Sequence, residues 1–232
     1  MKYYYDLHMH SCLSPCGDDD MTPNNIVNMA KLKGLDIIAV TDHNATYNLP
    51  AVMKVAQEVG LFVVPGIEVN TAEEVHMLVY FSSLKRAEQF GQRIYEALAD
   101  VPNNEEFFGK QQVMDENDKE LWRPKKLLIG ACSLTIDQVA GEAKEYEGFC
   151  VPAHVNKGAN SMLANLGFMP PHLQFPSVEV WKNGSLVGID LEHTRLLYSS
   201  DAHNLFDMNE RENYLNLEKL DYEHFFQKLC TF

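Results

Sequence analysis

Short apolar segments alternate along this chain with longer segments of helical periodicity, and this alternation restricts the fold more than any other feature. The apolar segments predict seven strands, at residues 3–7, 35–40, 61–64, 77–81, 149–152, 177–180 and 196–199. The helical segments among and after them cover residues 22–33, 49–59, 85–99, 136–146 and 222–229. This order predicts parallel strands joined by crossover helices, which is an α/β fold.

The number of these units also predicts the architecture. Seven units within 232 residues indicate one domain, residues 1–232, built as a compact TIM-like barrel. Residues 111–122 depart from the pattern, because two short strands flank the polar residues 115–118. We therefore expect a small β-hairpin insertion near residues 101–135.

The overall charge is strongly negative, with a formal net value of −14. Such a surface repels phosphate backbones, so we do not expect stable nucleic-acid binding. A small phosphorylated substrate is compatible with this charge, because bound metal cations reverse the local field. The five cysteines form no framework of paired spacings, and neither a signal peptide nor an apolar run of membrane-spanning length occurs. These features predict a reduced, cytoplasmic protein with no membrane partner, and they leave the oligomeric state open.

Histidines and carboxylates gather at the ends of the predicted strands, where α/β barrels place their active sites. His8 and His10 follow the first strand, and residues two apart on an extended chain point the same way. The other members of this group are His43, Glu68, His76, His154, Asp201 and His203. Imidazoles with carboxylates suit Zn, Mn or Fe, and the set is too large for one tetrahedral ion, so we predict a cluster of divalent ions.

Five motifs carry a resemblance to a known family. They are Asp6-Leu7-His8-Met9-His10, Thr41-Asp42-His43-Asn44, Pro65-Gly66-Ile67-Glu68, Pro152-Ala153-His154 and Ser200-Asp201-Ala202-His203. In this order the chain resembles the polymerase and histidinol phosphatase (PHP) family. The resemblance implies a distorted (β/α)7 barrel with two or three metal ions at its C-terminal face, and hydrolysis of phosphate esters.

The resemblance also implies how the ligands are divided. One ion would bind His8, His10, Glu68 and Asp201, and a second would share Glu68 and add His76 and His154. A third would bind His43, His203 and one residue of the loop after His10. The spacing leaves three candidates open for that loop ligand, namely Cys16, Asp18 and Asp20.

For the reaction, we expect a metal-activated hydroxide to attack phosphorus. Glu68, Asp201 and His203 are the expected catalytic residues, and Lys157 would stabilise the phosphoryl oxygens. The expected activity is that of a phosphomonoesterase on a small phosphorylated metabolite, similar to histidinol phosphate or a nucleotide. Two alternatives remain: a stand-alone nuclease or phosphodiesterase that uses the same site, and a catalytically silent metal-binding module.

Overall fold

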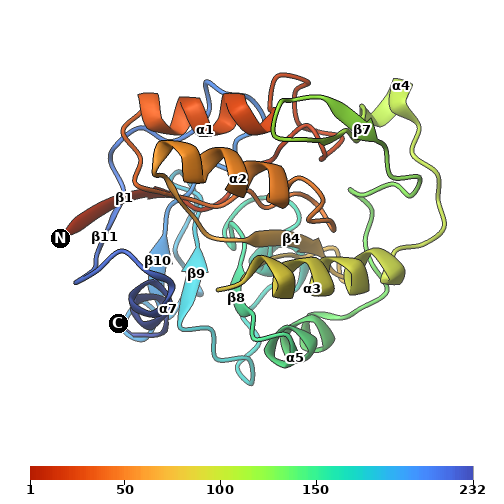
Figure 1. Cartoon of the computed structure of the whole chain (residues 1–232). Coiled ribbons are helices and arrows are strands. Elements are labelled where there is room, and N and C mark those ends of the chain that lie inside the picture. Colours follow the sequence, from red (N-terminus) through yellow and green to blue (C-terminus); the bar gives the residue numbers. More distant parts are fainter. Residues whose placement is uncertain (232) are drawn as a thin grey trace.

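The computed structural model describes residues 1–231, and its strands lie between two groups of helices (Figure 1). The first sheet has the strand order β11-β1-β2-β3, with bounds Tyr214–Asn216, Lys2–Asp6, Ile37–Ile38 and Phe62–Val63. Strands β1, β2 and β3 are parallel, as the strand–helix alternation predicted. Strand β11, which was not predicted, adds to β1 in the antiparallel direction.

A second sheet carries the centre of the candidate site and departs from the prediction. It contains β4 (Gly66–Asn70), β5 (His76–Tyr80) and β8 (Phe149–Pro152), and both pairings are antiparallel. Only residues 71–75 connect β4 to β5, which is too short for the crossover that parallel strands need. The prediction of parallel strands throughout is therefore wrong for this part of the chain.

The remaining strands pair in short ladders that do not close into a regular barrel within the described residues. Strands β9 (Ser177–Glu179) and β10 (Arg195–Leu197) form a parallel pair, and the chain after β10 meets the chain after β1 at the isolated parallel bridge Met9–Ala202. Residues 1–231 thus form separate short ladders, and no continuous seven-stranded TIM-like barrel is present. The strands in these ladders are two to five residues long.

The helices form where caps and apolar periodicity coincide. Helices α1 (Pro23–Leu32) and α2 (Leu49–Val59) lie side by side on one side of the strands, and α3 (Leu84–Ala97) and α5 (Ile136–Glu145) lie on the other (Figure 1). The Thr22 side chain caps α1, and Thr135 forms a capping box with Gln138 at α5. Helix α7 (Tyr222–Cys230) packs Phe225 and Leu229 into the core. No helix within residues 1–231 is long and apolar enough to cross a membrane.

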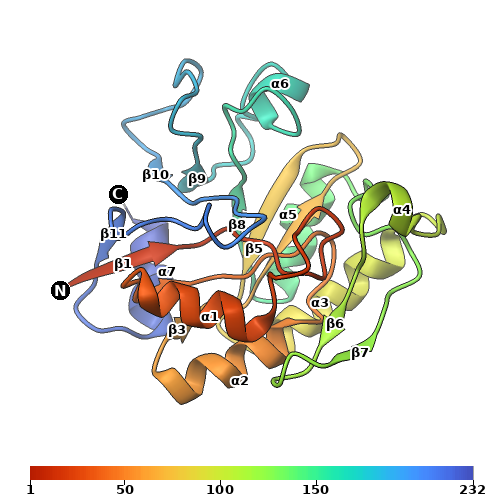
Figure 2. The same ribbon diagram turned by 90° about the horizontal axis from the view of Figure 1, so that it is seen from above.

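The predicted insertion is present and braces the loop that follows His10. It contains α4 (Glu105–Phe108) and a hairpin of β6 (Val113–Met114) and β7 (Glu120–Trp122), which lies at one edge of the molecule (Figure 2). Gln112 N donates to Cys12 O over 2.8 Å, and a Cβ on Gly109 would lie 2.1 Å from Pro15 O. The insertion therefore fixes residues 12–15 from outside. One further short helix, α6 (Met162–Asn165), follows β8.

Candidate metal centre

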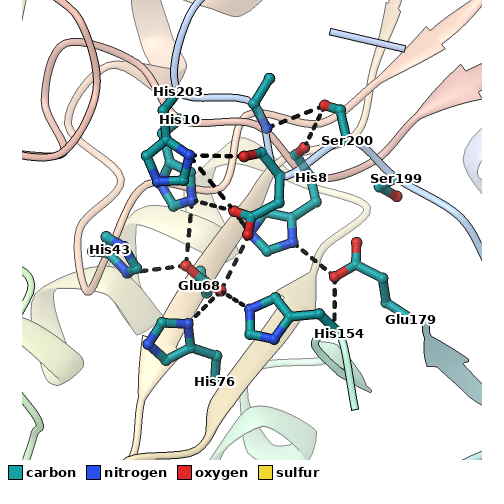
Figure 3. Close-up of polar contacts among 12 residues, drawn as sticks. His8, His10, His43, Glu68, His76, His154, Glu179, Ser199, Ser200 and His203 are labelled. Atoms are coloured by element: carbon teal, nitrogen blue, oxygen red, sulfur yellow. Dashed lines mark hydrogen bonds and ion pairs between the residues drawn. The ribbon is translucent and has the colours of Figure 1, made fainter. Parts of the chain in front are cut away.

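The carboxylate of Glu68 lies at the centre of the candidate site. This side chain is fully buried in β4 and is surrounded by imidazoles from four other segments of the chain (Figure 3). The imidazole nitrogens closest to its two oxygens belong to His76 at 2.8 Å, His43 at 2.9 Å, His8 at 3.2 Å, and His10 and His154 at 3.4 Å. Five of the predicted ligands thus converge on a sixth.

Short stretches of backbone pairing bring these side chains together. His43 and Glu68 form a parallel bridge in which Asn44 N donates to Glu68 O over 2.8 Å. Asp201 N donates to His8 O over 2.9 Å, which places the Asp201 carboxylate 3.3 Å from His8 Nε2 and 3.2 Å from His10 Nε2. Main-chain hydrogen bonds therefore join the segments that carry His43 and Glu68, and the segments that carry His8 and Asp201.

Three positions near the centre have a backbone conformation that L-residues rarely adopt. The φ angles are +50° at Asn44, +28° at His154 and +53° at Asp201. Such conformations cost about 1–3 kcal/mol each and persist where the surrounding structure requires them. Two of the three are predicted ligands, so backbone strain occurs where side chains must turn into the site.

Hydrogen bonds fix which nitrogen of three imidazoles is available. His8 Nδ1 faces the Glu179 carboxylate at 2.9 Å, and His203 Nδ1 faces the Asp201 carbonyl oxygen at 2.7 Å. Both oxygens only accept, so Nδ1 carries the proton and Nε2 keeps its lone pair. Ser14 Oγ donates to Asp42 Oδ1 over 2.7 Å and so accepts from His10 Nδ1 at 3.0 Å. All three rings therefore present Nε2 as a ligand atom.

The chemistry of this donor set fits divalent cations. Both Glu68 oxygens, His8 Nε2 and both His76 nitrogens are buried without a partner in hydrogen-bond geometry, although their neighbours are close. Burial acts to raise the pKa of Glu68, but the neighbouring His76, His8 and His43 outweigh it and hold that pKa well below its usual value. Burial lowers the pKa of His10 to about 3, so this imidazole is neutral. The ionised form of a carboxylate such as Glu68 and the neutral form of an imidazole such as His10 are the forms that bind a metal ion.

The structure separates the three candidates for the loop ligand. Cys16 Sγ lies with ligand atoms of His10, His43 and His203 in one group whose members are all within 4.8 Å of one another. Asp18 and Asp20 are exposed and belong to no such group. Two further groups of this kind are His8 with His10 and Asp201, and His43 with Glu68 and His76.

Lys157 lies at the exposed edge of the site. Its Nζ donates to Asp201 Oδ2 over 2.8 Å, and its side chain is 41% exposed. Burial acts to lower the pKa of Lys157, but the Asp201 charge outweighs it and raises that pKa above its usual value. The ammonium is therefore positioned to contact both Asp201 and a molecule that enters from solvent.

Two buried carboxylates support the site and were not predicted. Glu179 Oε2 accepts from His8 Nδ1 and from His154 N, each at 2.9 Å, so it links two ligand segments. Asp42 accepts from Ser11 N, Ser11 Oγ and Ser14 Oγ at 2.6–2.8 Å. The available sequence signal was an acidic residue within or directly after an apolar strand, in Ser-Val-Glu-Val and Ala-Val-Thr-Asp.

Replacing Glu179 with Gln should lower metal affinity about 10- to 100-fold, because an amide can turn its NH₂ group toward His8 Nδ1 and no longer fixes that imidazole. The measurement is metal content after dialysis against graded chelator. Glu192→Gln, which changes an exposed carboxylate, is the control. Unchanged metal retention in Glu179→Gln would show that His8 does not depend on this contact.

Several solved structures share this fold. Endonuclease Q from Pyrococcus furiosus is 20% identical, with a TM-score of 0.68 over 99% of this chain and 56% of that chain. A second endonuclease Q structure, described as a complex with duplex substrate that has an abasic lesion at the active site, is 19% identical with a TM-score of 0.63 over 97% of this chain and 55% of that chain. A putative metal-dependent phosphoesterase from Bifidobacterium adolescentis is 18% identical, with a TM-score of 0.61 over 98% of this chain and 96% of that chain.

These similarities correct one expectation from the sequence. Net charge led us to expect a small phosphorylated substrate and no stable nucleic-acid binding, yet a protein of this fold is described with a DNA duplex at its active site. The inference failed because net charge sums the whole surface, whereas a substrate responds to the local field around Lys157 and any bound cations.

Relatives found by sequence include a ribonuclease. A 5′-3′ exoribonuclease from Haemophilus influenzae is 33% identical over 71 residues, which cover 31% of this chain and 25% of that protein. The matched stretches span between 24% and 44% of the curated relatives. Residues 6–162 match the PHP domain family, which is more than half of this chain and includes six of the candidate ligands. The chain therefore belongs to the PHP domain family.

Proposed function

We propose that this protein is a metal-dependent phosphoesterase that cleaves phosphodiester bonds in nucleic acid and uses two or three divalent ions. The observation that carries the proposal is the buried Glu68 carboxylate with five imidazoles within 3.4 Å and Asp201 beside them. The activities of endonuclease Q and of the exoribonuclease support nucleic acid as the substrate class.

We assign the ligands in three groups. One ion would be held by His8, His10, Glu68 and Asp201, and another by Glu68, His76 and His154. A third would be held by His43, His203 and Cys16, whose ligand atoms lie together. Zn, Mn and Fe suit imidazole and carboxylate donors, and a thiolate at the third position favours Zn or Fe.

When bound, these ions would polarise the phosphoryl group and lower the pKa of water at the site toward neutrality. The residues of the chain orient the imidazoles and supply a further positive charge. Glu179, Ser14 and the Asp201 carbonyl hold three imidazoles with Nε2 directed into the site. Lys157 contributes a positive charge beside Asp201, where phosphoryl oxygens gain negative charge in the transition state.

The test combines metal content with hydrolysis by protein purified without chelator. The substrates are a single-stranded oligonucleotide with a 5′-phosphate, the same strand in a duplex, and a phosphomonoester. Two or three ions per chain and metal-dependent cleavage of an oligonucleotide would support the proposal. Bound metal with no hydrolysis of any substrate would contradict it and favour the silent metal-binding module.

Replacing Cys16 with Ser should change the spectrum of the Co²⁺-loaded protein. A thiolate ligand gives a charge-transfer band in the near ultraviolet, which a hydroxyl does not. We expect the band in the wild-type protein and its loss in Cys16→Ser, with one ion fewer per chain. Cys132→Ser, which changes a buried cysteine outside the cluster, should retain the band. If Cys16→Ser also retains it, Cys16 is not a ligand.

A further inference from the structure

Trp181 is an exposed aromatic side chain next to the candidate metal centre. It follows Val180, which is buried after β9, yet 40% of Trp181 is exposed. Lys157 Nζ lies 5.5 Å from the centroid of its ring and 2.8 Å from Asp201 Oδ2. The Lys157 ammonium therefore lies between the indole and Asp201, a proposed metal ligand.

The backbone of Trp181 is fixed to the loop that follows His154. Trp181 N donates to Asn156 Oδ1 over 2.6 Å, and Asn156 Nδ2 donates to Trp181 O over 3.0 Å. Gly184 N also donates to Trp181 O over 3.0 Å, and a Cβ on Gly184 would lie only 2.5 Å from Asn156 Nδ2. The close approach of this turn to Asn156 therefore requires glycine, and the turn holds the indole beside Lys157.

We propose that Trp181 is a stacking platform for the base of the nucleotide that carries the scissile phosphate. The inference rests on the proposed function and deepens it, because it specifies an unpaired nucleotide as the substrate. A base can stack on a protein ring only when that face of the base is exposed, as in a single strand. With the base on Trp181, Lys157 lies between the indole and Asp201, where the attached phosphate would enter the site.

The expected effect separates stacking from a general structural role. Stacking on an aromatic side chain changes affinity by about 5- to 100-fold per base. We expect Trp181→Ala to lower kcat/KM by that factor, mainly through KM, on a single-stranded oligonucleotide. The same variant should cleave a matched oligonucleotide with an abasic site at the cleaved nucleotide as well as wild type does, and Trp181→Phe should restore most of the loss.

Trp122 provides the matched control, because it is the only other tryptophan and is 45% exposed. Its ring packs on Tyr47 at a centroid distance of 4.9 Å, on β7 of the insertion. Trp122→Ala should leave kcat/KM unchanged on both oligonucleotides. An equal loss for Trp181→Ala on both substrates, or no loss on either, would overturn the platform.

Fluorescence of the Trp122→Phe protein, in which Trp181 is the only tryptophan, tests the platform without turnover. Quenching by a short single-stranded oligonucleotide, but not by its fully abasic counterpart, would support stacking. If that quenching occurs while no oligonucleotide is cleaved, the platform stands and the proposed nuclease function fails. If cleavage occurs without quenching, the nuclease function stands and the platform fails.

Discussion

Replacing Glu68 with Gln should lower kcat on a phosphodiester by on the order of 10³-fold. The carboxylate is buried among five imidazoles and is the only proposed ligand shared by two ions. Gln keeps the shape but removes the charge, and charge stabilisation at such a site contributes several kcal/mol, at 1.36 kcal/mol per tenfold in rate. The measurement is steady-state hydrolysis with excess metal, together with metal content per chain.

A thermal melt distinguishes loss of metal from loss of fold in Glu68→Gln. Ligands that bind only the native state raise its stability, so added metal should raise the Tm of the wild-type protein and leave that of the variant nearly unchanged. With chelator, the two proteins should melt at similar temperatures. Glu88→Gln, an exposed substitution on α3, is the matched control. Wild-type metal content and activity in Glu68→Gln would refute the central role of this carboxylate.

Replacing Lys157 with Met should lower kcat/KM by about 10²-fold, as expected when one donor to a developing negative charge is removed. The ammonium contacts Asp201 at 2.8 Å and belongs to none of the three proposed ligand groups. We therefore expect metal content to stay at the wild-type level while turnover falls. The measurement is hydrolysis of an oligonucleotide and of a phosphomonoester at saturating metal.

Lys182 supplies the control for this prediction, because it has the same charge and lies next to Trp181. Its side chain is 48% exposed and pairs with Glu212 instead of Asp201. Lys182→Met should leave kcat/KM close to the wild-type value at moderate salt, since exposed pairs contribute little. Equal losses in the two variants would show that general surface charge matters, and that Lys157 has no specific role.

Many helix boundaries could be predicted because their signals are local. Thr22 and Pro23 begin α1, and Gly60 ends α2 in a left-handed conformation. Strand directions were harder to predict from the sequence, because they depend on which distant segments pair. The turn of residues 71–75 reverses the chain, so His76 faces Glu68 from an antiparallel neighbour.

The loop ligand also could not be identified from the sequence. Cys16, Asp18 and Asp20 all lie at plausible distances from His10 along the chain, so spacing alone could not choose among them. In the structure the insertion contacts this loop, since Gly109 packs against Pro15 and Gln112 N donates to Cys12 O. In this arrangement Cys16 lies near His43 and His203, and both aspartates are exposed.

The sequence by itself determined the donor groups of the candidate site. The predicted ligands follow or occupy short strands, and their imidazoles and carboxylates suit divalent metal ions: His8, His10, His43, Glu68, His76, His154, Asp201 and His203. Only the tertiary structure decided their distances, the roles of Glu179 and Asp42, and the place of Trp181 beside Lys157. The physical reason is that donor chemistry is a property of each side chain, whereas a binding site depends on contacts between segments far apart in the chain.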